Sequence, residues 1–210
     1  MRHPSDGPGQ WIISGDGRRW RFDAGAPSLD FAYTGDRGLG VDAWERLREP
    51  RDLGAWLAER EPRLAAEDAG PRELLDALAL RGAISRLATA VVDGEEPAPD
   101  DVDTLNLYAA MPDIPPALPG GARQAGAGRL RVAQALSSLA RDAIAVLGED
   151  EGRLRRCEAD DCRLVFRDES RTRNRRWCSM QRCGNRAKVR AHRERAAAAR
   201  AARVISRPEM

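Results

Sequence analysis

The strongest constraint on this chain is the position of its cysteines. All four lie within 27 residues, as Cys157-x4-Cys162 and Cys178-x4-Cys183, and 15 residues separate the two pairs. Two close pairs joined by enough chain for a hairpin can bring four thiolates together around one Zn²⁺ ion. The pattern therefore predicts a structural zinc site with these four cysteines as its ligands.

Two other uses of clustered cysteines remain open. Structural disulfides would suit an oxidising compartment, but the first residues lack the apolar core of a secretion signal, so we expect a cytoplasmic protein. Redox sensing would need thiolates poised to react, whereas zinc-bound thiolates are usually structural. No apolar run approaches the roughly 18 residues of a membrane span, so we expect no membrane partner.

The segment around the cysteines needs a metal because its own apolar content is thin. Between Leu154 and Gly184 only a handful of large apolar side chains occur. A core of that size does not stabilise about 40 residues unaided. Zinc binding can contribute folding free energy on the order of 10 kcal/mol, which is enough to fold such a module. Arg163 and Arg182 stand beside two of the cysteines, where they could balance thiolate charge or contact DNA.

Charge divides the chain into two unlike parts. Residues 153–210 hold 18 Lys and Arg against 7 Asp and Glu, whereas the preceding residues hold 17 basic and 26 acidic ones. A basic surface attracts a polyanion, and an acidic body does not. The cysteine-containing part is therefore the candidate for nucleic-acid binding.

A basic helix is predicted directly after the last cysteine, over about residues 184–203. Ala and Arg dominate this stretch, and both are strong helix formers. Arg186, Arg190 and Arg193 fall on one side of such a helix, whereas Lys188 and Arg195 fall on the other. An α-helix fits the major groove of DNA, where Arg can bind guanine. A solvated tail helix is the simpler alternative.

A second group of arginines lies between the cysteine pairs, where a loop is expected to hold DNA phosphates. The two groups together are the predicted DNA contacts: Arg171, Arg173, Arg175, Arg176, Arg186, Arg190 and Arg193. His192 is a further candidate zinc ligand, but four cysteines already complete the site.

The rest of the chain predicts a helical domain with a small β-hairpin at its start. We expect a disordered leader at 1–10, a helical domain at 11–150 and a zinc finger with its basic helix at 153–203. Two β-favouring runs flank Asp16-Gly17, which indicates a hairpin. Five helical segments follow: one capped by Ser28, one around Trp56, one from Pro71 to just before Gly94, and two more at about 101–111 and 129–147, separated by a Pro/Gly-rich loop. The fold class is mainly α, with a second hairpin in the finger.

Two motifs resemble a known family. Residues 177–180 read Trp-Cys-Ser-Met and residues 183–186 read Cys-Gly-Asn-Arg, which is similar to the signature of the CGNR zinc finger. In that family the finger follows an ABATE domain, a putative stress-induced transcription-regulator module. Residues 22–25 (Phe-Asp-Ala-Gly) and 29–34 (Leu-Asp-Phe-Ala-Tyr-Thr) resemble its opening motif, with Tyr33 where Asn is more usual. The resemblance implies zinc on the four cysteines, DNA binding by the finger and a role in stress response.

The leading hypothesis is a zinc-dependent DNA-binding transcription regulator whose helical body senses a small molecule or a protein. The alternative is a zinc-stabilised adaptor that binds a protein or RNA. Regulators that read paired half-sites are commonly dimers, so a homodimer is also expected.

An enzyme is not expected, because the sequence contains no recognised nucleophile or phosphate-loop motif. Asp30 could be a ligand-binding carboxylate, although a cap or an internal ion pair is the simpler interpretation. An effector pocket, if the body has one, would be lined by Trp20, Phe31 and Trp56.

Overall fold

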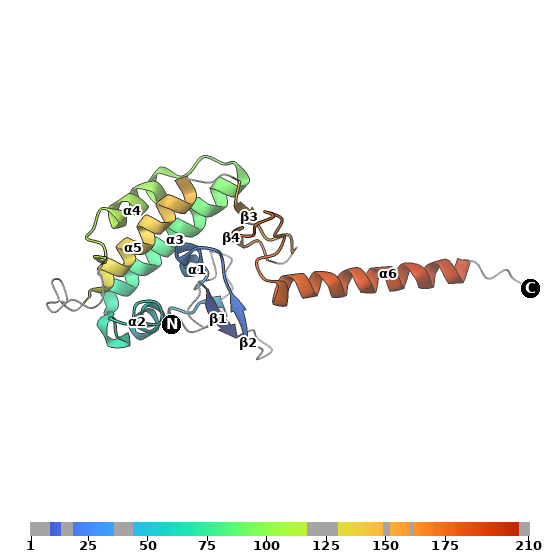
Figure 1. The fold of residues 1–210 in the computed structure, drawn as a ribbon, viewed down its shortest axis with the longest axis horizontal. Coiled ribbons are helices and arrows are strands. Elements are labelled where there is room, and N and C mark those ends of the chain that lie inside the picture. The colour runs from blue at the N-terminus through green and yellow to red at the C-terminus, as the bar shows by residue number, and fades with distance from the viewer. Residues whose placement is uncertain are drawn as a thin grey trace, which may run out of the picture.

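The computed structural model describes residues 9–13, 19–35, 44–116, 130–148, 152–159 and 162–205, with backbone alone at 13 and at 201–205. The chain is mainly helical, as predicted, with one two-stranded hairpin before the helices of the body in chain order and another after them (Figure 1). In chain order the elements are β1 (Gln10–Ile13), β2 (Arg19–Phe22), α1 (Pro27–Ala32), α2 (Pro50–Ala58), η2 (Ala66–Asp68), α3 (Pro71–Asp93), α4 (Pro99–Ala109), α5 (Val132–Gly148), β3 (Leu154–Arg156), β4 (Val165–Arg167), η3 (Met180–Gly184) and α6 (Asn185–Ile205).

The first hairpin pairs β1 and β2 in antiparallel register, with Trp11 opposite Arg21. The predicted Asp16-Gly17 turn lies outside the described residues, as do residues 1–8 of the predicted leader and 117–129 of the predicted loop. Among the helices of the described residues, none combines the length and hydropathy that a membrane-spanning segment requires.

Proline sets the start of each helix from α1 to α4. Its fixed φ suits the first helical turn, and that turn has no use for the missing N–H. The predicted cap at Ser28 is wrong, because α1 already begins at Pro27. The Ser28 N–H instead donates to the Asp142 carboxylate on α5, at 2.9 Å, so a neighbouring helix provides the cap. The end of α3 is as predicted: Gly94 adopts a left-handed φ of 68°.

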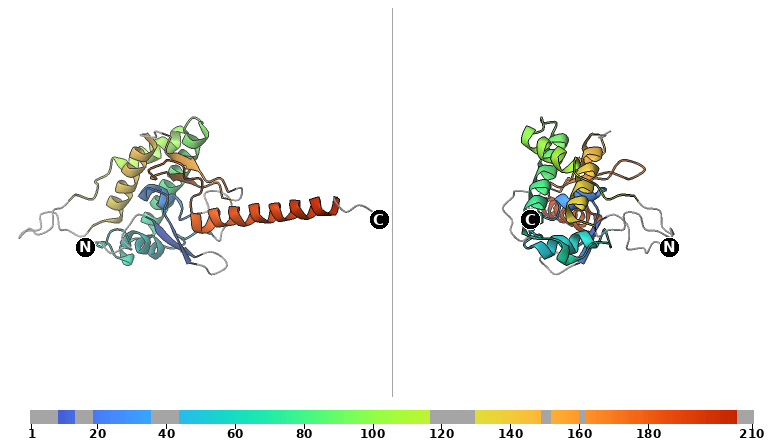
Figure 2. Two further views of the ribbon diagram at one scale, coloured as in Figure 1. Left: turned by 45° about the vertical axis from the view of Figure 1, so that its right-hand side comes forward. Right: turned by 90° about the vertical axis from the view of Figure 1, so that its left-hand side faces the viewer.

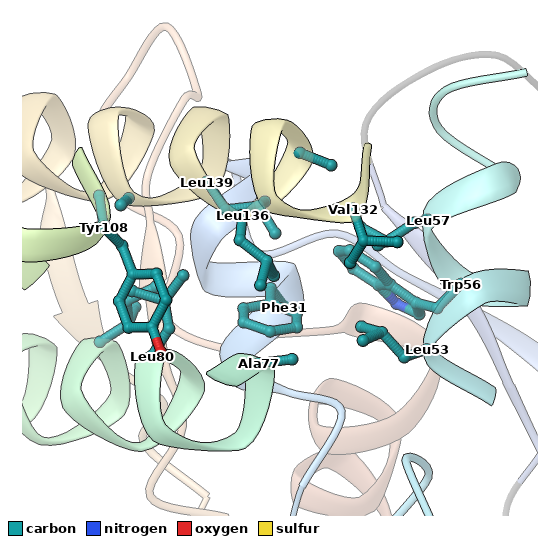
Figure 3. Packing of buried hydrophobic residues seen from close by; sticks show 14 of the residues in the cluster. Phe31, Leu53, Trp56, Leu57, Ala77, Leu80, Tyr108, Val132, Leu136 and Leu139 are labelled. Carbon is teal, nitrogen blue, oxygen red and sulfur yellow. The ribbon is translucent and has the colours of Figure 1, made fainter. Parts of the chain in front are cut away.

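The main core lies where α1 meets α2, α3 and α5 (Figure 3). Phe31 is fully buried there and packs against Trp56, with the ring centroids 5.3 Å apart. Trp20 belongs to a second cluster beside the C-terminal hairpin. The three aromatic residues expected to line an effector pocket are therefore core side chains, divided between two clusters.

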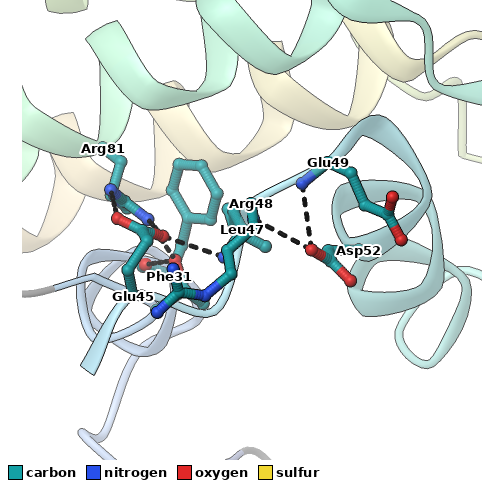
Figure 4. Close-up of polar contacts among 8 residues, drawn as sticks. Phe31, Glu45, Leu47, Arg48, Glu49, Asp52 and Arg81 are labelled. Carbon is teal, nitrogen blue, oxygen red and sulfur yellow. Dashed lines mark hydrogen bonds and ion pairs between the residues drawn. The ribbon is translucent and has the colours of Figure 1, made fainter. Parts of the chain in front are cut away.

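Two carboxylates fix the segment that leads into α2 (Figure 4). Glu45 forms an ion pair with Arg81 of α3 at 2.6 Å and accepts the Leu47 N–H at 2.8 Å. Burial would raise the pKa of Glu45, but the hydrogen bonds and charge of Arg81 together with the N–H groups of Leu47 and Arg46 outweigh it and hold that pKa below its usual value. Asp52 accepts the N–H groups of Arg48 and Glu49 at 2.9 and 3.0 Å, which caps α2.

Asp30 joins the first hairpin to α1. Its carboxylate is buried and accepts the Ala24 N–H at 2.9 Å, and its backbone oxygen accepts a hydrogen bond from the Gln10 amide at 2.7 Å. These contacts are internal and structural. Burial raises the pKa of Asp30 to about 7, and the nearby Asp23 charge adds to the effect.

Replacing Asp30 with Asn keeps the oxygen that accepts the Ala24 N–H but removes the titration. Because folding raises the pKa of Asp30, the folded state binds the proton more tightly than the unfolded state, and the wild type loses stability relative to Asp30→Asn as pH rises from about 4 to about 7. The expected slope is at most about 1.4 kcal/mol per pH unit. Urea unfolding of both proteins between pH 5 and 8 measures it. Glu95→Gln, at an exposed position, is the control, and a difference that does not vary with pH would contradict the prediction.

Candidate metal centre

Four cysteines converge at the C-terminal hairpin. Cys157 follows β3, and Cys162 precedes β4. Cys178 lies just before η3, and Cys183 lies within η3. All four side chains are buried, and their sulfur atoms lie within 4.8 Å of one another. The structure thus brings together the four residues that the sequence predicted as ligands.

The sulfur positions suit a tetrahedral ion. The Cys178 sulfur lies 3.5 Å from that of Cys162 and 3.6 Å from that of Cys183. Zn–S bonds of about 2.3 Å in a tetrahedron place neighbouring sulfur atoms about 3.8 Å apart. The Cys178 N–H also points at the Cys157 sulfur, at 3.4 Å, as a donor toward a thiolate would.

Thiol groups packed this closely cannot all ionise without a cation. Hydrogen bonds with Cys162 hold the pKa of the Cys157 thiol well below its usual range, whereas hydrogen bonds with Cys157 raise the pKa values of Cys162 and Cys178 well above it. A divalent cation at the centre removes this conflict, because it stabilises every thiolate at once. Four sulfur donors are the ligand set that zinc prefers in structural sites.

Asp168 organises the loop between the cysteine pairs, and sequence reasoning missed it. Its buried carboxylate accepts the N–H of Ser170 at 2.9 Å and the N–H of Arg175 at 2.8 Å. Burial would raise the pKa of Asp168, but these hydrogen bonds and the nearby Arg155 hold it below its usual value. The one available signal was an acidic residue at the end of a strand inside an otherwise basic segment.

Arg175, which was predicted to contact DNA, is half-buried. Its guanidinium donates to the backbone oxygens of Asp23 at 2.7 Å, Trp177 at 3.0 Å and Cys178. The same group lies over the Phe166 ring, 4.4 Å from the centroid. These contacts hold the Nε and Nη2 donors within the fold, so Arg175 has a structural role.

The other arginines of this loop lie at the surface. Arg171, Arg173 and Arg176 are exposed. Arg173 has a positive φ of 49°, and its backbone oxygen accepts a hydrogen bond from Arg155 at 2.9 Å. Arg176 forms an ion pair with Glu158 at 2.6 Å.

The predicted basic helix is α6, and it divides into two parts. Arg186, in its first turn, is half-buried, and its guanidinium donates to the Cys183 sulfur at 3.4 Å. From Lys188 to Arg200, Arg190 and Arg193 included, every side chain is exposed. In Figures 1 and 2 this part extends away from the body. His192 lies in this exposed part, away from the buried cysteine cluster.

The cysteine cluster shares a core with the helical body. All four cysteines belong to one cluster with Trp20 of β2, Leu29 of α1, Ala88 of α3 and Val146 of α5. This core crosses the boundary at about 150–153 that the sequence suggested. Removal of the metal would therefore disturb the body as well as the finger.

Polar contacts also connect the C-terminal hairpin to the helical body. The Arg167 N–H of β4 donates to the Ala24 oxygen at 2.7 Å, and Arg156 of β3 pairs with Asp93 of α3 at 2.5 Å. A Cβ on Gly25 would lie 2.4 Å from the Arg167 oxygen, so the two backbones approach closely at this point. The position also has a φ of +82°, a region that favours glycine.

Comparison with known families agrees with both halves of the chain. The model of a family described as "Putative stress-induced transcription regulator" (ABATE) matches residues 25–150. The model of the CGNR zinc finger matches residues 153–196. No curated protein matches the sequence. With the four converging thiols, the finger match identifies zinc as the cofactor of this protein.

We expect one zinc per chain, and Cys178→Ser should abolish its binding. Because Cys178 and Cys183 lie in the core shared with β2 and α3, chelation should unfold 153–185 and also lower the hydrogen-exchange protection of the β1–β2 hairpin. The helices α3, α4 and α5 should stay folded around the main core. Metal analysis and hydrogen-exchange mass spectrometry, with and without chelator, measure these effects.

Gln181→Ser, at an exposed position between Cys178 and Cys183, is the matched control and should leave zinc content unchanged. Substoichiometric zinc in reduced, folded protein would refute a structural metal. Unchanged protection of the first hairpin after zinc removal would refute the coupling through the shared core.

Proposed function

The chain belongs to the ABATE family of putative stress-induced transcription regulators, and on that premise we propose that it binds duplex DNA through its zinc finger. In this proposal Cys157, Cys162, Cys178 and Cys183 hold the zinc ion. The ion fixes the finger, and α6 and the loop after β4 contact the nucleic acid.

The observation that carries the proposal is the exposed part of α6. Between residues 188 and 200 it has five basic side chains and one acidic one, all of them exposed. At 1.5 Å per residue the 21 residues of α6 extend about 31 Å, and Figure 1 shows the helix leaving the body. A helix with this charge and with its side chains exposed is suited to the major groove of DNA.

The loop after β4 supplies a second contact at the surface. The buried Asp168 carboxylate fixes the backbone of this loop through its hydrogen bonds. Arg171 and Arg173 are therefore exposed side chains on a fixed backbone. Arginines held in this way are suited to DNA phosphates, which position a protein on the duplex without reading its sequence. We leave Arg175 out of this role because it is half-buried and its guanidinium bonds backbone oxygens. Arg176 is already paired with Glu158 and would contribute less.

The proposed DNA contacts are therefore a smaller set than the sequence suggested. They are Arg171 and Arg173 in the loop and Arg190 and Arg193 on α6. Each is exposed, and the two groups extend from the same zinc-bound fold. The acidic body, with 26 acidic and 17 basic residues before residue 153, would face away from the polyanion.

Arg171→Ala should weaken binding to all duplex sequences alike. A lost phosphate contact reduces the slope of log K against log salt by about one unit, because one fewer counterion is released. Fluorescence titration of labelled duplexes at several salt concentrations measures both quantities. Arg72→Ala, an exposed arginine at the start of α3, is the control and should leave the slope unchanged.

Arg193→Ala should behave differently, because α6 would lie in the groove. We expect a loss of about 1–3 kcal/mol on the preferred site and weaker discrimination against altered sites. A preferred site comes from selection of bound genomic fragments with the wild-type protein. If neither Arg171→Ala nor Arg193→Ala changes DNA binding by the zinc-loaded protein, the proposal fails and a protein- or RNA-binding adaptor becomes the better account.

A further inference from the structure

Arg186 stands apart from the other basic residues of α6. It is half-buried, three residues after Cys183, and its guanidinium donates to the Cys183 sulfur at 3.4 Å. Lys188 and the residues that follow are exposed. The same helix thus begins with an arginine directed at the metal centre and continues with arginines in solvent.

The negative charge of the metal centre explains how the contact between Arg186 and Cys183 can stabilise the site. Zn²⁺ with four thiolates carries a net charge of −2, and the sulfur atoms here are buried, with Cys183 fully inaccessible. A cationic donor close to such a group stabilises the thiolate form and fixes the direction of its lone pairs. Partners of this kind typically change metal affinity by about 10- to 100-fold when removed.

The two arginines that the sequence suggested as counter-charges are placed differently. The Arg182 guanidinium lies over the Trp20 ring, 5.3 Å from its centroid. Arg163 is exposed, has a φ of 50°, and accepts a hydrogen bond from Arg156 through its backbone oxygen. Arg186, by contrast, donates a hydrogen bond from its guanidinium to a cysteine sulfur.

We propose that Arg186 is a positioning residue of the zinc site: it holds the Cys183 thiolate and thereby ties the first turn of α6 to the metal. The sequence had suggested a base-reading role for this residue. Arg190 and Arg193 lie on the same side of the helix, about one and two turns further on. Zinc therefore sets the direction in which these two side chains leave the fold. That consequence for DNA rests on the proposed function, but the contact with the zinc site does not.

The test compares Arg186→Ala, Arg186→Gln and Arg186→Lys with Arg193→Ala as the matched control on the same side of the helix. Competition with a chromophoric chelator gives the zinc affinity and the rate of zinc release for each full-length protein. Cobalt(II) substitution gives a spectroscopic signature, because the thiolate-to-cobalt charge-transfer bands report directly on the sulfur ligands.

Arg186→Ala and Arg186→Gln should weaken zinc binding by about 10- to 100-fold and shift the charge-transfer bands. Arg186→Lys keeps the charge but loses the planar guanidinium, so it should recover part of the affinity. Arg193→Ala should match the wild type in both measurements. If the Ala variant does not fold, the Lys variant still decides: an unchanged affinity and an unchanged cobalt spectrum in Arg186→Lys overturn the proposal.

DNA binding at saturating zinc separates this inference from the proposed function. Unchanged zinc affinity with lost DNA discrimination in Arg186→Ala would show that Arg186 reads DNA, which overturns the inference and leaves the function standing. Weakened zinc binding in Arg186→Ala supports the inference even if no variant alters DNA binding, and in that case only the function fails.

Discussion

Mutual repulsion among four buried thiolates is the constraint on which the C-terminal part of the structure depends. The sulfur atoms lie within 4.8 Å of one another, so the fold brings together charges that only a cation can hold. Zinc contributes free energy on the order of 10 kcal/mol to the folded state alone, since the unfolded chain offers no preformed site. The hairpin β3–β4, the helix η3 and the start of α6 are all held by that one ion.

The shared core extends this dependence into the helical body. Phe22 is fully buried beside the cysteine cluster, and it stacks on Tyr33 with the ring centroids 4.0 Å apart. Burial and the negative charge of Cys178 raise the pKa of Tyr33, which shows how near the ring lies to the thiolates. The helical body and the finger therefore share side chains that pack against the cysteines.

Local patterns in the sequence were sufficient for the main helices, for the two hairpins and for the four cysteines that the structure brings together. Cysteine spacing predicted the zinc site, and Pro71 and Gly94 predicted the limits of α3, because each signal acts within a few residues of itself. The cap of α1 could not be found in this way, since Asp142 is more than a hundred residues from Ser28. The contact from Arg175 to the Asp23 oxygen could not be predicted for the same reason, since the two residues are distant in sequence.

Burial, rather than position in a basic run, separates the arginines of the finger by task. Arg175 is turned inward and bonds backbone oxygens, which joins the loop to the first hairpin. Arg186 is half-buried and meets a metal ligand. Arg171 and Arg193 are exposed, where a guanidinium can exchange water for phosphate at little cost in desolvation. A count of positive charge treats these residues as equal, but only the exposed ones can bring their charge to a polyanion, so the basic surface is narrower than the sequence implies and lies along α6 and the loop after β4.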